Sequence, residues 1–277
     1  MPTVTVGREN SADITIHYED HGAGQPVVLI HGYPLSGRGW DKQVPALLDA
    51  GYRVITYDRR GFGASSQPAV GYDYDTLAAD LSALLERLDL REVILVGHSM
   101  GTGEVTRYLS SYGSARVAKG VLVAPIPPFL LQTPDNPDGV PQSLFDGFVQ
   151  AAAADTPAWM KGFLDNFYNA DTLLGTLVSN QAYQASWNIA AAASATAAVA
   201  CIPTWTTDFR TDLPKIDVPI LVVQGDADQV LPIAKTGQRL PGLIGDVRLV
   251  VIEGGPHGIP WTHADRVNTA LLDFLRS

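Results

Sequence analysis

Cysteine is almost absent from this chain: Cys201 is the only one among 277 residues. A single thiol cannot form an internal disulfide or supply a thiolate metal cluster, so we expect a small buried residue. No two His, Cys or carboxylate side chains show metal-ligand spacing on one element, and P-loop, dinucleotide and haem-attachment motifs are also missing. The sequence therefore predicts neither a metal nor a cofactor.

Charge is scarce as well, at 17% of residues, and Lys and Arg form no block. The net charge of -10 makes nucleic acid and anionic membranes poor partners. No apolar stretch approaches the roughly 20 residues of a membrane helix, and the Ala-rich segment 190–200 is too short. The first residues lack the basic and apolar regions of a signal peptide. We expect a soluble cytoplasmic enzyme.

Apolar runs without alternation are plentiful, at 26–30, 53–57, 93–96 and 120–123. Such runs are typical of strands buried on both faces of a parallel sheet. Between them, residues 75–88 place leucines at three- and four-residue spacing, which predicts an amphipathic helix. The alternation of strand and helix predicts a doubly wound α/β core, with a hairpin before it near 3–6 and 13–18.

The alternation stops near Pro125 and resumes with an apolar run at 217–223. We expect a helix near 232–240, a strand at 246–252 and a closing helix from about 261 to 275. The stretch between is rich in proline, aromatics and helix-like patterns. The sequence therefore predicts a core of residues 1–125 and 214–277 that carries a helical cap insertion at 126–213.

A nucleophile is indicated by Gly97-His98-Ser99-Met100-Gly101, which reads G-x-S-x-G. The motif follows the apolar run 93–96 and precedes a helix-compatible stretch near 102–111. Strand, sharp turn and helix are the context in which a serine hydroxyl is raised above the end of a sheet. The flanking glycines fit a strained turn with close neighbours. Ser99 is the predicted nucleophile.

A serine nucleophile needs a base and an orienting carboxylate, and in such sheets the chain order is Ser, Asp or Glu, then His. His257 follows the strand at 246–252 and is the predicted base. His263 falls in the closing helix, where we expect an exposed or capping residue. Asp228, just after the strand at 217–223, is the predicted orienting acid, while Asp226 is expected to fix the turn through a backbone hydrogen bond.

An acyl-transfer site also needs donors for the developing oxyanion. The N–H of Met100 is one predicted donor, and the N–H of Tyr33, in the loop after the strand 26–30, is the other. Pro34 cannot donate. We expect His31 to brace this loop, and the stretch 58–65 to form a tight turn with a structural arginine network.

The whole chain resembles the α/β-hydrolase superfamily, and more narrowly the cofactor-free haloperoxidases or perhydrolases with their aryl-esterase and γ-lactamase relatives. The resemblance rests on the stretches PVVLIHGYPLSG, GYRVITYDRRGFGASSQP, GYDYDTLAADL, VGHSMGTGEVTRY, NPDGVPQ, TDFR and PHGIPWTHAD. It implies an α/β-hydrolase fold with a mostly parallel sheet of about eight strands, and homo-oligomers that are trimers or dimers of trimers. The triad that it implies agrees with Ser99, Asp228 and His257. The predicted pocket residues are Pro34, His98, Ile126, Phe129, Trp205 and Ile259.

The resemblance implies a metal-free reaction in which Ser99 takes an acyl group from a small ester or carboxylic acid. Water then completes hydrolysis, whereas hydrogen peroxide gives a peracid that oxidises bromide or chloride. Pro34, after the oxyanion residue, is expected either to turn the Tyr33 carbonyl toward peroxide or simply to stiffen the loop. Many close relatives carry phenylalanine where this chain has His98, and 124–129 blends features of several branches, so substrate preference is not transferred.

Two alternatives stay open. A lactam-opening amidase could use the same triad, and kinetics on a bicyclic lactam against an aryl acetate would separate the two. A catalytically silent binding protein on this fold, such as a hormone receptor, is the other. The complete set of Ser99, Asp228 and His257 argues against it.

Overall fold

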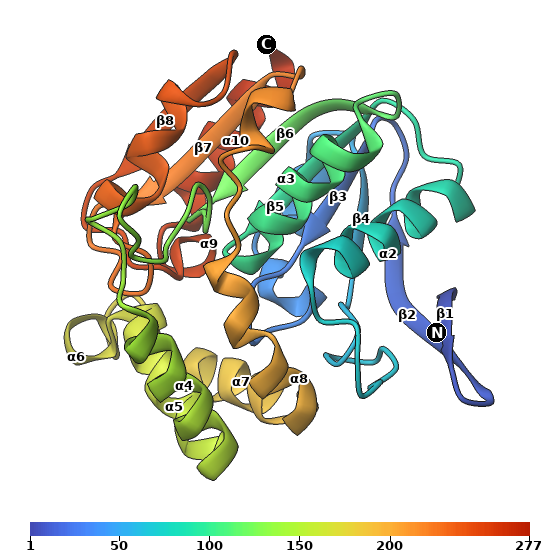
Figure 1. Cartoon of the computed structure of the whole chain (residues 1–277). Helices are drawn as coiled ribbons and strands as arrows, with labels where there is room; N and C mark the ends of the chain where they lie inside the picture. The colour runs from blue at the N-terminus through green and yellow to red at the C-terminus, as the bar shows by residue number, and fades with distance from the viewer.

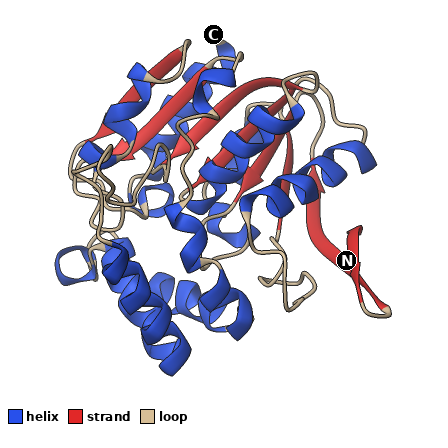
Figure 2. Cartoon of the chain, in the orientation of Figure 1, coloured by secondary structure: helices blue, strands red, loops and turns tan.

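A computed structural model describes all 277 residues, and in it a single twisted sheet has helices on both faces (Figures 1 and 2). The strands are β1 (Thr3–Glu9), β2 (Ala12–His21), β3 (Pro26–Ile30), β4 (Arg53–Tyr57), β5 (Val93–His98), β6 (Val117–Val123), β7 (Ile220–Gly225) and β8 (Val247–Ile252). Their order across the sheet is β1-β2-β4-β3-β5-β6-β7-β8. Strands β3 to β8 run parallel, while β2 pairs antiparallel with both β1 and β4. The predicted sheet of about eight mostly parallel strands is confirmed.

The helices account for most of the remaining chain. The α-helices are α1 (Val44–Asp49), α2 (Tyr74–Arg87), α3 (Met100–Tyr112), α4 (Gln142–Ala154), α5 (Thr156–Tyr168), α6 (Ala170–Leu173), α7 (Asn180–Ala191), α8 (Ala195–Ala200), α9 (Ile259–Thr262) and α10 (Ala264–Arg276). Short 3-10 helices are η1 (Gly37–Trp40), η2 (Ile202–Thr206), η3 (Leu213–Lys215), η4 (Ile233–Lys235) and η5 (Gly237–Gly242).

Successive residues of each central strand point to opposite faces, and both faces are buried. Val28 and Ile30 of β3 belong to the larger apolar cluster, which α2 and α3 cover. Val27 and Leu29 belong to the second cluster, which α1 and α10 cover. Because neither face meets water, the strand sequences are continuously apolar rather than alternating.

Helix α2 illustrates why these segments become helices. The Asp73 carboxylate accepts the Thr76 N–H at 2.9 Å and caps the first turn. Leu77, Leu81 and Leu84 then form one buried stripe along the helix. Helix α3 packs beside α2 on the same face of the sheet and carries Ser99 at its N-terminal end.

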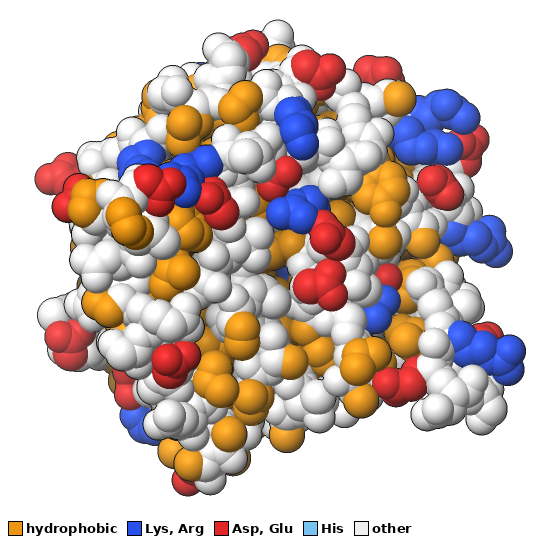
Figure 3. Space-filling model, viewed as in Figure 1, with side chains coloured by type: hydrophobic (Ala, Val, Ile, Leu, Met, Phe, Trp, Pro, Cys, Tyr) orange, Lys and Arg blue, Asp and Glu red, His pale blue; other side chains and the backbone are white.

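Helices α4 to α8 follow β6 and precede β7, and they gather below the sheet in Figure 1. They fall within the predicted insertion at 126–213, whose limits as a separate domain stay a prediction. On the face shown in Figure 3, hydrophobic side chains are frequent over these helices, and basic side chains are dispersed among acidic ones. No single helix has the length and apolar composition to cross a membrane. Asn180–Ala191 and Ala195–Thr206 meet those criteria only when joined across a 97° bend.

Two predicted helices are wrong in detail. Residues 232–240 form the short η4 and η5 rather than one helix, because the Gln224 side chain binds within the segment. Its Oε1 accepts the N–H of Gly237 at 3.0 Å, and its Nε2 donates to the Leu231 carbonyl at 2.7 Å. The helical conformation is lost at Thr236, with φ -130° and ψ -96°, and a Cβ on Gly237 would lie 2.3 Å from Gln224 Oε1, so only glycine fits beside this side chain.

The closing helix is divided into α9 and α10 at His263, whose backbone leaves the helical conformation at φ -123° and ψ 39°. The carbonyls of α9 are taken by side chains from another part of the core. Gln43 Nε2 donates to the Pro260 carbonyl and Lys42 Nζ to the Trp261 carbonyl, each at 2.9 Å. Those carbonyls would otherwise accept helical N–H groups, so the helix ends and restarts.

Candidate active site

Ser99 lies at the turn between β5 and α3, with φ 53° and ψ -118°. A non-glycine residue rarely takes a positive φ, and this strain is typical of the turn that lifts a nucleophilic serine above a sheet. The flanking glycines are required by space. A Cβ on Gly97 would lie 2.4 Å from the Gly101 carbonyl oxygen, and a Cβ on Gly101 would lie 2.4 Å from the Ile30 carbonyl oxygen.

His257 and Asp228 form a buried pair at the same edge of the sheet, since they follow the parallel strands β8 and β7. His257 Nδ1 is 2.9 Å from Asp228 Oδ2, and neither side chain is exposed. A carboxylate oxygen can only accept, so Nδ1 carries the proton and Nε2 keeps its lone pair. His257 Nε2 has no hydrogen-bond partner in the protein. The arrangement leaves an imidazole nitrogen that can take a proton.

Asp228 is fixed by its own loop. Its Oδ1 accepts the N–H groups of Val230 and Leu231 at 2.9 Å and 2.8 Å. Asp226, two residues earlier, instead accepts the Gly254 N–H at 2.7 Å, so its backbone hydrogen bond joins the loop after β7 to the loop after β8 rather than fixing its own turn. The structure therefore brings Asp228 and not Asp226 to His257.

The other histidine after Ser99 is His263. It is half-buried, and its Nδ1 lies 2.9 Å from the Thr262 hydroxyl. It is a capping residue, as one of the two expectations had it: it ends α9, where its N–H donates to the Ile259 carbonyl, and precedes α10, where its side chain makes no cap hydrogen bond.

The predicted oxyanion donors are the N–H groups of Met100, next to Ser99 in the chain, and of Tyr33, which lines the same cavity as Ser99, and their role stays a prediction. Met100 is the first residue of α3, so its N–H has no acceptor within the helix. The Tyr33 N–H has no acceptor in the protein. A Cβ on Gly32 would lie 2.9 Å from Ser99 Cβ, so the absent side chain lets the Tyr33 loop approach the nucleophile.

A buried polar network holds this loop from the core side. Arg59 donates its N–H to His31 Nε2 at 2.9 Å and a guanidinium N–H to the His31 carbonyl at 2.8 Å. His31 Nε2 thus accepts, and Nδ1 donates to the Gly32 carbonyl at 2.9 Å. Burial, with the positive Arg59, lowers the pKa of His31 well below its usual value, which keeps the ring neutral. His31 braces the loop, as expected.

The network continues to the helix of the nucleophile. Arg59 Nε is 2.9 Å from Glu104 Oε2 on α3, and both side chains are buried. Arg60 pairs separately with Asp80 at 2.6 Å and 2.7 Å. The arginine network expected for 58–65 is therefore present, and its member Arg59 links the Tyr33 loop to α3.

Ser99 opens onto a cavity of about 630 Å³ under the helices that follow β6. Fourteen of its 21 lining residues are hydrophobic. Ile126 and Trp205, both predicted for the pocket, line it, as does Tyr33. The sequence did not indicate most of the wall, which consists largely of Phe145, Phe148, Trp159, Phe163 and Leu231. The signal was present as aromatic residues three and four positions apart on α4 and α5.

Four residues predicted for the pocket lie outside this lining. Phe129 packs under the Arg210 guanidinium at 4.7 Å, and Ile259 is buried in the second apolar cluster. Pro34 is buried in the Tyr33 loop. Phe129 and Ile259 are therefore near the site along the chain, but their side chains pack elsewhere.

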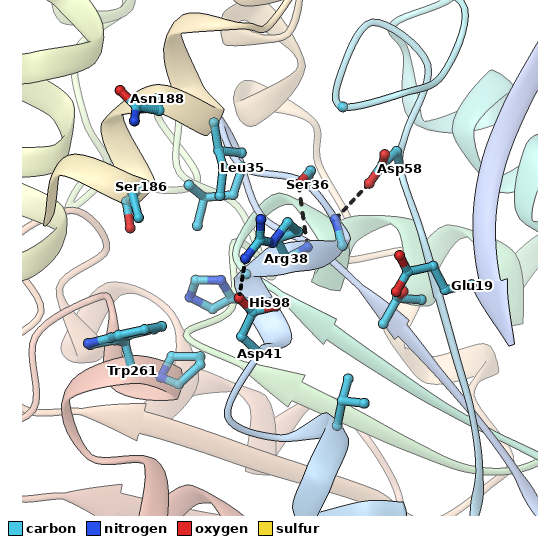
Figure 4. Close-up of a pocket in the computed structure, with 18 of the residues that line it drawn as sticks. Glu19, Leu35, Ser36, Arg38, Asp41, Asp58, His98, Ser186, Asn188 and Trp261 are labelled. Atoms are coloured by element: carbon cyan, nitrogen blue, oxygen red, sulfur yellow. Dashed lines mark hydrogen bonds and ion pairs between the residues drawn. The ribbon is translucent and has the colours of Figure 1, made fainter. Parts of the chain in front are cut away.

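His98, the fourth, lines a separate cavity of about 770 Å³ (Figure 4). Trp261, Arg38 and Asp41 line the same cavity, and Arg38 donates to the Asp41 carboxylate at 3.2 Å. His98 Nε2 is 3.1 Å from the His257 carbonyl, which can only accept, so Nε2 donates. Burial, together with the nearby His257, lowers the pKa of His98 to about 3. The side chain of His98 therefore turns away from the cavity of Ser99.

No three His, Cys, Asp or Glu side chains lie where they could hold one metal ion. Cys201 is fully buried, and burial raises the pKa of its thiol to about 12.

Comparison with known proteins agrees with this geometry. A family model described as the α/β hydrolase fold matches residues 25–264. The chain is 63% identical over 276 residues to a putative non-heme chloroperoxidase of Synechocystis, with each chain fully covered. It is 36% identical to a bifunctional esterase/perhydrolase of Acinetobacter calcoaceticus, over 95% of this chain and 97% of that one. A bromoperoxidase from Bacillus anthracis superposes with a TM-score of 0.95 at 46% identity, over 100% of this chain and 99% of the other. This chain therefore belongs to the α/β-hydrolase family, as an enzyme of the serine-hydrolase branch that includes non-haem haloperoxidases and esterase/perhydrolases.

Proposed function

We propose that the protein hydrolyses small esters through an acyl-enzyme on Ser99, with His257 as general base and Asp228 as the group that orients it. The observation that carries the proposal is the buried Asp228–His257 pair, which occupies Nδ1 and leaves Nε2 free. A serine hydroxyl is a weak nucleophile at its usual pKa and gains reactivity from such a base. The strained turn at Ser99 supports the same assignment.

Acylation and deacylation need only these three side chains, two backbone N–H groups and water. Ser99 Oγ attacks the carbonyl carbon while its proton passes to His257 Nε2, and the N–H groups of Tyr33 and Met100 donate to the oxyanion. His257 then returns the proton to the departing alcohol, which leaves an acyl-enzyme. Each oxyanion donor is typically worth a factor of about 10² to 10³ in rate. Water, deprotonated by His257, releases the acid.

Hydrogen peroxide is the proposed alternative acceptor. Attack by peroxide on the acyl-enzyme gives a peracid and frees Ser99. The peracid then oxidises halide outside the site: peracid, bromide and a proton give carboxylic acid and hypobromous acid. Relatives named as a chloroperoxidase and as an esterase/perhydrolase support this route. The role predicted for Pro34, turning the Tyr33 carbonyl toward peroxide, is part of the proposal.

The cavity supports an apolar acyl group as the preferred donor, because most of its lining is aromatic or aliphatic. Carboxylic acids would enter by the reverse of deacylation. The lactam-opening alternative is not favoured, since the relatives reported above are haloperoxidases and an esterase. A cytoplasmic location and a trimer or dimer of trimers stay predictions.

Ser99→Ala tests the shared acyl-enzyme. We expect aryl-acetate hydrolysis and bromination in acetate with peroxide to fall together, by on the order of 10⁶. Ser111→Ala, exposed near the end of the same helix, is the matched control. Retained bromination in Ser99→Ala alongside lost hydrolysis would contradict the shared intermediate.

The halide reaction has a second test in buffer composition. We expect bromination to fall to background in phosphate, to appear in acetate and to survive a strong chelator. A serine-directed sulfonyl fluoride should abolish it. Chelator-sensitive bromination that proceeds equally in phosphate would overturn the peracid route and leave the esterase proposal standing.

A further inference from the structure

We propose that Trp159 of α5 is a positioning residue for the oxyanion site: its indole N–H fastens the Tyr33 side chain to the helices above the cavity and so fixes the Tyr33 amide. The inference rests on the proposed function, because it takes the Tyr33 N–H as an oxyanion donor. On this proposal, α5 lines the cavity and also helps to position an oxyanion donor.

The Tyr33 hydroxyl is bonded on two sides by elements distant in sequence. Trp159 Nε1 donates to it at 2.8 Å across a separation of 126 residues. The hydroxyl in turn donates to the Ala198 carbonyl of α8 at 3.0 Å, across 165 residues. Burial raises the pKa of Tyr33 above its usual value, so the hydroxyl keeps the proton that this second bond needs.

The Tyr33 ring is confined as well as bonded. It packs edge-on against Trp205 at 5.1 Å, Phe163 at 5.2 Å and Phe62 at 6.1 Å between ring centroids. Only 1% of Tyr33 is exposed. Because the ring and the amide share one Cα, a ring fixed at its far end limits how the amide can turn.

The Tyr33 loop is therefore held from two directions. On the core side, His31 fixes the Gly32 carbonyl, one residue before Tyr33. On the cavity side, Trp159 holds the far end of the Tyr33 side chain. Neither contact supplies the oxyanion donor, but together they set where that donor points.

Position is decisive for such a donor. An oxyanion hydrogen bond acts at about 2.7–3.1 Å from the developing charge, and a misplacement of about 1 Å can cost about 100-fold in rate. Loosening Tyr33 should weaken this contact without removing it. We therefore expect a loss of about tenfold in kcat, smaller than deletion of a donor, with KM changed less than about twofold.

Trp159→Phe is the direct test, because it keeps an aromatic ring in the wall and deletes the N–H. Trp205→Phe is the matched comparison. Trp205 lines the same cavity and touches the same ring, but its Nε1 has no hydrogen-bond partner in the protein. The effect of Trp205→Phe measures what altering the wall costs by itself. The proposal requires kcat of Trp159→Phe to fall well below that of Trp205→Phe.

A double-mutant cycle with Tyr33→Phe separates positioning from general damage. Once the hydroxyl is gone, Trp159 has nothing to hold, so Trp159→Phe should cost little more in the Tyr33→Phe background. A boronic acid that forms a tetrahedral adduct on Ser99 should also bind Trp159→Phe about tenfold more weakly, with KM nearly unchanged.

Equal kcat in Trp159→Phe and Trp205→Phe, or additive losses in the cycle, would overturn the inference. Failure of the proposed function would look different. In that case the wild-type protein would not bind the boronic acid, and Ser99→Ala would retain ester hydrolysis.

Discussion

Helices α3 and α4 have the same length, 13 residues, but opposite surroundings. Helix α3 buries nine of its residues, because it packs on the sheet and beside α2. Helix α4 buries only Phe145 and Ala152, and several of its side chains line the cavity of Ser99. The proposed nucleophile is therefore mounted on a closely packed helix, whereas α4, which contributes to the cavity wall, packs through far fewer of its residues.

The two regions also differ in how they hold polar groups. The core buries the ion pairs Arg59–Glu104 and Arg60–Asp80, whereas the contact from α5 to Tyr33 is a single neutral hydrogen bond among aromatic rings. We infer that substitutions on the core side reduce the rate or the stability, and that substitutions in the wall change selectivity or modulate the rate. Three predictions test this contrast, from the largest expected effect to the smallest.

Asp228→Asn should lower kcat/KM for an aryl ester by about 10⁴, because an amide in this place favours the wrong tautomer of His257. Asp226→Asn is the matched control, since it makes the same change two residues away and its amide oxygen can still accept the Gly254 N–H. We expect less than about a twofold change there. Equal losses in both variants would show that the loop, and not the Asp228–His257 contact, limits the rate.

The same contrast explains what the sequence could reveal. The bounds of β3 and β4 coincide with the predicted runs 26–30 and 53–57, because strands buried on both faces must be apolar throughout. Ser99, Asp228 and His257 could be predicted because each follows a strand of the parallel sheet, β5, β7 and β8. The carboxyl ends of parallel strands share one edge of the sheet, so the order of the motifs along the chain was enough to place all three residues at that edge.

The cavity wall could not be predicted in this way. Phe129 and Ile259 are apolar and near the motifs in sequence, yet they point into packing, while Phe148 and Trp159 reach the cavity from separate helices. Which face of α4 or α5 meets the cavity depends on how helices with few buried residues pack on one another. A helical period alone does not specify that packing.

Glycine substitutions should sharpen the contrast in stability. Gly101→Ala would place a Cβ 2.4 Å from the Ile30 carbonyl oxygen, a backbone atom that cannot move aside. We expect the free energy of unfolding to fall by about 2–3 kcal/mol. Gly147→Ala in α4 meets nothing within 4 Å and should instead gain about 0.5–1 kcal/mol from helix propensity. Urea unfolding measures both, and a loss in Gly147→Ala would mean that α4 is as tightly packed as α3.

Histidine titration should act on the core alone, because the six histidines of the chain all lie outside helices α4 to α8. Burial, with His257 nearby, lowers the pKa of His98 from 6.5 to about 3. Between pH 6.5 and pH 3, residue 98 is therefore protonated in the unfolded chain and neutral in the folded protein. The stabilisation is therefore complete above pH 6.5 and is lost as the pH falls toward 3, by at most about 1.4 kcal/mol per pH unit.

His98→Gln retains an N–H for the His257 carbonyl but does not titrate. Urea unfolding between pH 7 and pH 4.5 should therefore give it a shallower slope than the wild type, with a remainder from His31, whose pKa is also lowered. Equal slopes would mean that His98 binds its proton as readily in the folded protein as in the unfolded chain, and would contradict this prediction.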